Sequence, residues 1–273
     1  MAKLKPHPLM AAIVDNPDAD LPRLVYADWL DEQGDPKLAI LAEYIRLEVE
    51  WHPLKSDSEQ CRNLGRRREE LFKLAGGSIR PPLPTWARKN SRRVTLLTAR
   101  GLPHSLECTL KQFARGGTVL EYAPIVEVRL GDTHYLDGRD LPADAPFAAA
   151  ALARKELIRV RDLSVYGPLG DDAFAALAAN PNVSNIRKLE LHDLTTLSEA
   201  SAAALASAAL RLAKLRELSL SFEYPYRYYP DHARDTLLDA FDYPCDLSIN
   251  NSRVTRSFEE LGIDYYGPGF GSG

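Results

Sequence analysis

A short apolar pattern that recurs along the second half of the chain constrains its fold more than any other feature. Each copy has two apolar residues separated by one residue, and four of the five copies have a further apolar residue three positions before the first. Alternation of this kind is typical of a β-strand that buries one face. The copies begin at Val128, Leu163, Leu189, Leu218 and Leu247, at spacings of 35, 26, 29 and 29 residues.

The Ala/Leu segments between the copies have helical spacing, so the predicted unit is a strand followed by a helix. A unit of this kind buries its apolar face only against its neighbours, and a row of units builds one continuous core. Cys108 and Leu110 carry the two-residue pattern 20 positions before Val128 and indicate a sixth unit. The helical faces predicted in two units are Phe174, Leu177 and Ala178, and Leu205, Ala208, Ala209 and Leu212.

The full pattern, apolar-x-x-apolar-x-apolar, resembles that of leucine-rich repeats, whose period is roughly 20–29 residues. The resemblance implies a curved α/β solenoid with parallel strands and outer helices. One feature departs from it. Leucine-rich repeats place Asn or Cys eight residues after the first apolar position. The residues found at those positions here are Thr133, Pro168, Leu194 and Glu223. We therefore expect degenerate repeats over residues 101–273, with a flexible C-terminal tail.

Residues 1–100 have the pattern of a small helical bundle. Apolar faces at helical spacing predict helices that begin near Leu9, Leu21, Leu38 and residue 57, and Asp20 fits the N-cap of the second. The glycines at 76–77 and the prolines at 81–84 indicate a connection between packed units, so we place a boundary near residue 100. The buried positions predicted for the second and fourth helices are Leu21, Leu24, Val25, Trp29 and Leu30, and Cys61, Leu64, Leu71, Phe72 and Ala75.

Asp28 interrupts the apolar stripe of the second predicted helix. It lies four residues after Leu24, so helical geometry turns it toward the apolar face. A carboxylate for recognition or catalysis is one interpretation. We favour a structural role, in which Asp28 accepts hydrogen bonds from a helix end or from Arg23 or Arg46, because no convergent catalytic partners accompany it.

Four motifs stand close together in the helical segment. They are Asn16-Pro17-Asp18, the run DLPRLVYADWLDE over 20–32, Gly34-Asp35-Pro36, and AEYIRL over 42–47. Together they resemble the bacterial repeat-companion domain family, a short N-terminal helical module followed by leucine-rich or other repeats. The resemblance covers about residues 6–50. It implies a repeat array downstream and no established activity.

The composition is that of an ordinary globular protein, with 45% hydrophobic and 26% charged residues. The net charge of −4 excludes a globally basic nucleic-acid binder. Three widely spaced cysteines argue against a disulfide scaffold and favour a reducing compartment. No stretch approaches the roughly 20 apolar residues that span a bilayer. We therefore expect a soluble, cytoplasmic, monomeric protein with no membrane contact.

The sequence offers little for catalysis. The six histidines have no zinc-site spacing, and no nucleophile elbow, P-loop or dinucleotide-binding glycine motif occurs. Cys108 is predicted to be a small core residue on a strand. Asp171 and Asp172 are better explained by a helix N-terminus than by acid–base chemistry. We predict a protein that is not an enzyme and that has no metal and no cofactor.

Binding residues are easier to place. Side chains between the apolar strand positions would line the concave surface of a solenoid, and tyrosine and arginine in a nearby loop are typical interface anchors. The alternatives are solvated strand positions and a loop that caps the last repeat. We predict a protein–protein interaction surface with an unknown protein partner. Its candidate residues are Arg129, Tyr166, Glu190, His192, Tyr224, Tyr226, Arg227, Tyr228 and Tyr229.

The segment 62–100 supports an alternative function. It holds 11 basic residues and only two acidic ones, Glu69 and Glu70. Such a segment could bind nucleic acid or another anionic surface, although no nucleic-acid-binding motif accompanies it. Ion pairs with the acidic repeat half of the chain explain the charges equally well.

Overall fold

The computed structural model describes residues 7–54, 58–77, 79, 83, 87, 94–131, 145–194, 197–222, 231–241, 245–249 and 252–253. The fold is α/β, with an eight-stranded sheet whose strands follow one another in sequence order. Strands β2 to β7 are parallel, while β1 and β8 pair antiparallel at the two ends. The strands are β1 (Val94–Ala99), β2 (Leu102–Cys108), β3 (Glu127–Leu130), β4 (Asp162–Tyr166), β5 (Lys188–Leu194), β6 (Glu217–Phe222), β7 (Asp246–Ile249) and β8 (Ser252–Arg253).

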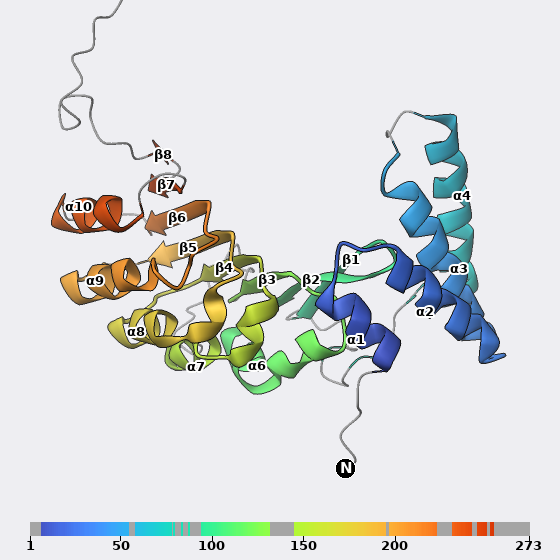
Figure 1. Ribbon diagram of the computed structural model, residues 1–273, viewed down its shortest axis with the longest axis horizontal. Helices are drawn as coiled ribbons and strands as arrows, with labels where there is room; N and C mark the ends of the chain where they lie inside the picture. The colour runs from blue at the N-terminus through green and yellow to red at the C-terminus, as the bar shows by residue number, and fades with distance from the viewer. Residues whose placement is uncertain are drawn as a thin grey trace, which may run out of the picture.

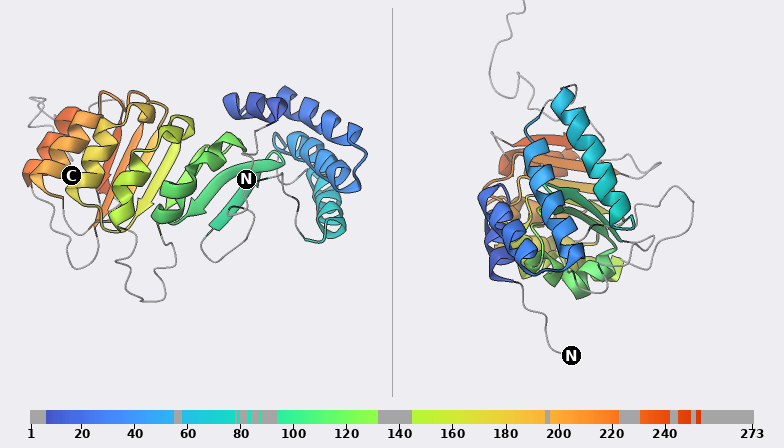
Figure 2. Two further views of the ribbon diagram at one scale, coloured as in Figure 1. Left: turned by 90° about the horizontal axis from the view of Figure 1, so that it is seen from below. Right: turned by 90° about the vertical axis from the view of Figure 1, so that its right-hand side faces the viewer.

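Helices cover one face of this sheet (Figures 1 and 2). Each helix packs against the next in sequence, and their apolar side chains share one continuous core with the strands. Short 3₁₀ turns complete several of the connections. The helices are α6 (Leu110–Gly116), α7 (Ala148–Leu152), α8 (Asp171–Ala179), α9 (Glu199–Ala208) and α10 (Asp231–Ala240), with the turns η1 (Gly117–Glu121), η3 (Ala145–Phe147), η4 (Lys155–Arg159) and η5 (Pro181–Val183).

The repeated apolar pattern sets the strand register. The first apolar residues of successive copies, from Val128 to Leu247, are direct neighbours across β3 to β7, and all of them are buried. The sixth unit is offset from its predicted position. Leu106 and Cys108 pair with Val128 and Leu130, whereas Leu110 already begins α6. Cys108 is confirmed as a core residue.

Four N-terminal helices lie beyond β1, at the opposite end of the sheet from β7 (Figure 1). The helix that begins at Leu21 buries Leu30, as predicted, but otherwise a different stripe from the predicted one. Leu21 and Val25 are 71% and 42% exposed, and the buried face is Arg23, Tyr26, Ala27 and Leu30. Phe72, predicted inward, is also exposed. The helices are α1 (Pro8–Asp15), α2 (Leu21–Glu32), α3 (Pro36–Trp51) and α4 (Glu59–Leu74).

Asp28 is therefore exposed and does not face the apolar side of α2. Its carboxylate accepts a hydrogen bond of 2.7 Å from Arg46 on α3, which is one of the two partners predicted for a structural role. Asp20 stands at the N-cap of α2 but makes no side-chain capping bond. It pairs instead with Arg100, at 3.2 Å.

The turn between β1 and β2 fastens the helices to the sheet. Gly101 lies against α3, and Leu102 of β2 is buried in the apolar cluster of α1, α2 and α3. The Arg161 guanidinium pairs with the Asp18 carboxylate at 2.7 Å. Residue 100 falls in this turn, between two paired strands. The division of the chain into two folding units at that point stays a prediction.

Neighbouring units are also joined by polar side chains. Asn180, 4% exposed, donates to the carbonyls of Leu152 and Arg154 at 2.7 and 3.0 Å. Asp171 accepts hydrogen bonds from Ser198 and Ser201, both at 2.5 Å, which explains this carboxylate at the start of α8 without catalysis. Asn180 directly follows α8 and joins this unit to the one before it.

Candidate functional site

The face of the sheet opposite α6–α10 carries rows of polar and aromatic side chains, and we call it the open face. Side chains at equivalent positions of β3 to β7 are neighbours in register, and parallel strands hold them roughly 5 Å apart. The face runs across five strands of the sheet. Its residues are Glu127, Arg129, Asp162, Ser164, Tyr166, Lys188, Glu190, His192, Glu217, Ser219, Ser221, Asp246 and Ser248.

An aromatic pair lies near the C-terminal ends of β4 and β5. The rings of Tyr166 and His192 stack with centroids 4.4 Å apart and planes at 10°. His192 Nδ1 is 3.2 Å from Ser221 Oγ, within hydrogen-bond distance, whereas Nε2 is buried without a hydrogen-bond partner and lies 3.8 Å from Glu190 Oε2. Burial, followed by the nearby Glu190 carboxylate, raises the pKa of Tyr166. The pair therefore forms two stacked rings on the open face, with the Nε2 atom of His192 buried.

A charged cluster lies directly beside the ring pair. Lys188 Nζ is 2.9 Å from the Glu190 carboxylate and 3.0 Å from that of Glu217, and Ser164 donates to Glu190 at 2.7 Å. Partial burial alone would raise the pKa of Glu190, but hydrogen bonds from Lys188 and Ser164 outweigh it and lower that pKa. Hydrogen bonds to Glu190 and Glu217 raise the pKa of Lys188.

We expect the substitution Lys188→Met to raise the pKa of Glu190. Burial of the carboxylate would remain while its strongest hydrogen bond is lost, so the neutral acid becomes more stable relative to the charged form. An NMR titration of the glutamate side chains measures this directly. The control Lys155→Met removes a cation that lies 3.8 Å from Glu121 and should leave Glu190 unchanged. An unshifted Glu190 in Lys188→Met would show that Lys188 does not set its charge state.

The structure brings together four of the predicted binding residues. Arg129, Tyr166, Glu190 and His192 all lie on the open face, on β3, β4 and β5. Arg129 pairs with Glu127 at 2.6 Å. The other predicted residues, Tyr224, Tyr226, Arg227, Tyr228 and Tyr229, lie outside the described residues.

Sequence reasoning missed Gly131, which positions the ring pair. Its φ is +125°, and a Cβ placed there would lie 2.5 Å from the backbone oxygen of Tyr166 and 2.8 Å from its Cβ. Only glycine allows the end of β3 to approach β4 so closely. The signal available in the sequence was a glycine directly after a predicted strand, at both 131 and 167.

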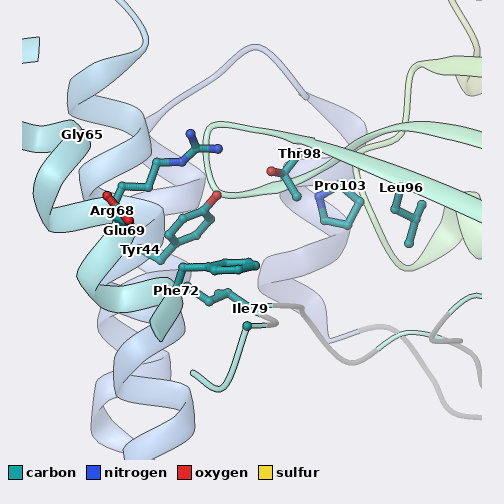
Figure 3. A pocket seen from close by; sticks show the side chains of 10 residues that line it. Tyr44, Gly65, Arg68, Glu69, Phe72, Ile79, Leu96, Thr98 and Pro103 are labelled. Carbon is teal, nitrogen blue, oxygen red and sulfur yellow. The ribbon is translucent and has the colours of Figure 1, made fainter. Parts of the chain in front are cut away.

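A separate groove of about 580 Å³ lies between α4 and the β1–β2 hairpin (Figure 3). Phe72, Tyr44 and Ile79 contribute apolar walls. Arg68 at its rim pairs with Glu48 at 2.6 Å and lies 4.8 Å from the ring centre of Trp51. This guanidinium is therefore engaged by its own chain.

Arg67 of the basic segment is similarly engaged. Arg67 pairs with Glu43 at 2.7 Å and with Glu70 at 2.9 Å. These partners come from α3 and α4 rather than from the acidic repeat half of the chain. The basic residues at 88, 89, 92 and 93 lie outside the described residues.

Two further searches of the described residues concern metals and membranes. No group of three or more His, Cys, Asp or Glu side chains in the described ranges is placed to hold a metal ion. No helix within them is long and apolar enough to cross a bilayer. Comparison of the chain with family models, with curated proteins and with solved structures finds no match.

Proposed function

We propose that this chain is a protein-interaction module without enzymatic activity, in which the open face binds another protein. In this proposal the sheet and its helices form a degenerate leucine-rich-repeat solenoid. The helices α1–α4 form a repeat-companion domain, and the open face is the concave side. The in-register apolar pattern and the motifs between residues 16 and 47 support the assignment.

The observation that carries the proposal is that the polar side chains of the open face hold one another in place. Glu190 is held by Ser164 at 2.7 Å and by Lys188 at 2.9 Å, and Lys188 is held in turn by Glu217 at 3.0 Å. Tyr166 stacks on His192. A partner that binds such a surface orders few side chains, so little of the binding free energy is lost to conformational entropy. Aromatic rings with polar edges are typical interface anchors.

Site-specific photo-crosslinking in cells of the source organism tests the proposal. The photo-reactive residue p-benzoylphenylalanine is placed at position 166 on the open face or, as the control, at position 203 on the exposed side of α9. We expect a discrete protein adduct from position 166 alone, and the captured protein, once purified, should bind this chain saturably. Identical adducts from both positions, or none from position 166, would contradict the proposal.

A further inference from the structure

A row of arginines precedes the parallel strands on the edge where those strands begin. Arg161, Arg187 and Arg216 stand directly before β4, β5 and β6. They are equivalent positions in register, because the Arg187 backbone N–H donates to the Arg161 carbonyl at 2.6 Å and that of Arg216 to Arg187 at 2.7 Å. The spacing of parallel strands therefore places successive arginines roughly 5 Å apart along the edge.

A second polar row lies two residues earlier, at Arg159, Asn185 and Lys214. Lys214 Nζ donates to Asn185 Oδ1 at 2.7 Å, and Asn185 Nδ2 donates to the Ile158 carbonyl at 2.7 Å. The two rows meet in a cavity of about 340 Å³, which we call the basic-edge pocket. Its lining residues are Val14, Asp15, Pro17, Ile158, Arg159, Arg161, Asn185, Arg187 and Lys214.

The chain itself shows which groups this pocket accepts. Asp18 reaches Arg161 at 2.7 Å, and Asp15 lies 3.8 Å from Arg159. Both carboxylates belong to the end of α1 and the residues after it, and both occupy the β4 side of the pocket. On the β5 and β6 side, Arg187, Lys214 and Arg216 form no ion pair with any described residue.

We propose that the basic-edge pocket binds an acidic protein segment. Asp18 and Asp15 begin a row of carboxylates at this pocket, and the carboxylates of the bound segment would extend that row along Arg187, Lys214 and Arg216. Arginine matches a carboxylate with two parallel hydrogen bonds. Four cations and two carboxylates meet at the pocket, which leaves a positive excess on its β5 side. The site is separate from the open face, because it lies at the edge where the strands begin and does not use the ring pair.

A fluorescently labelled decaglutamate peptide, followed by fluorescence polarisation at low salt, tests this assignment on the full chain. The variant Arg187→Gln/Lys214→Gln should weaken binding by about tenfold or more, since two charged partners are lost. The matched control Arg62→Gln/Lys73→Gln removes the same charge from exposed positions of α4. It should change the affinity by less than about twofold if the pocket, and not net charge, binds the peptide.

A second variant provides a gain of affinity. Asp18→Asn removes the carboxylate that now pairs with Arg161, so the peptide should bind more tightly than to the unmodified chain. Three results would overturn the proposal: no binding of decaglutamate, an equal loss in the α4 control, or weaker binding in Asp18→Asn. A single-stranded oligonucleotide that binds the pocket more tightly than the peptide would also overturn it, in favour of a nucleic-acid ligand.

Discussion

Replacing Arg154 with alanine is expected to lower the free energy of unfolding by about 3 kcal/mol, because it leaves a buried carboxylate without its cation. The Glu156 side chain is 2% exposed. Arg154 Nε and Nη2 contact its two oxygens at 2.9 and 2.8 Å, and Nη1 donates to the Ala114 carbonyl at 3.0 Å. This one guanidinium therefore joins η4 to α6. Its loss leaves the Glu156 carboxylate and the Ala114 carbonyl without this hydrogen-bond donor.

The neighbouring residue supplies the control. Lys155 is exposed, and its contact with Glu121 is 3.8 Å long. Lys155→Ala should change stability by no more than about 0.5 kcal/mol. Urea unfolding followed by circular dichroism measures both variants. If Arg154→Ala were as stable as Lys155→Ala, the buried ion pair would not hold the α6–η4 contact.

Gly101→Ala is expected to destabilise the chain by about 2–4 kcal/mol, through two effects that add. The φ of Gly101 is +78°, which an L side chain adopts only at a cost of roughly 1 kcal/mol. A Cβ at this position would also lie 2.6 Å from Ile45 Cα, so the hairpin or α3 must move. Overpacking of this kind costs about 1–3 kcal/mol.

Gly34 separates the two effects. Its φ is +68°, and nothing lies within 4 Å of a Cβ built there, so Gly34→Ala should show only the conformational cost of about 1 kcal/mol. The same unfolding experiment compares the two alanines. Equal losses would mean that the β1–β2 turn does not dock against α3 as described.

The strand half of the fold was predictable from the sequence because alternation leaves one acceptable register. A slip by one residue would turn Leu163 and Leu189 away from the helices and expose them. The residues at equivalent positions of each copy are therefore neighbours in the sheet. The offset at Cys108 arose because Leu110 is apolar as well, although it belongs to the following helix.

The helical half was harder to predict because α2 carries two stripes at helical spacing. Leu21 and Val25 belong to the predicted one, Tyr26 and Ala27 belong to the other, and Leu30 belongs to both. The second is buried together with Arg23, a residue that is 1% exposed and donates a hydrogen bond to the Ala19 carbonyl at 2.9 Å. Hydrophobicity alone would not place an arginine in a core, so only the packing of α2 against its neighbours decides which stripe is buried.

The residues of the candidate site also differ in how far the sequence predicts their positions. Tyr166, Glu190 and His192 could be assigned to one face, since strand alternation fixes the side of every residue. Gly131 and the Lys188–Glu217 contact depend on how closely adjacent strands approach and on side-chain reach across them. These contacts join residues about 30 positions apart, and no local pattern in the sequence records them.

The central proposal is that the open face, and not the helical face, binds a protein. Its most direct test is the affinity of the protein captured at position 166 for three variants: Tyr166→Ala, His192→Ala and the helix-side control Arg211→Ala. We predict that each open-face variant weakens binding by about 1–2 kcal/mol with an unchanged melting temperature, and that the control binds normally. Normal binding by both open-face variants, or a loss in Arg211→Ala alone, would contradict the account.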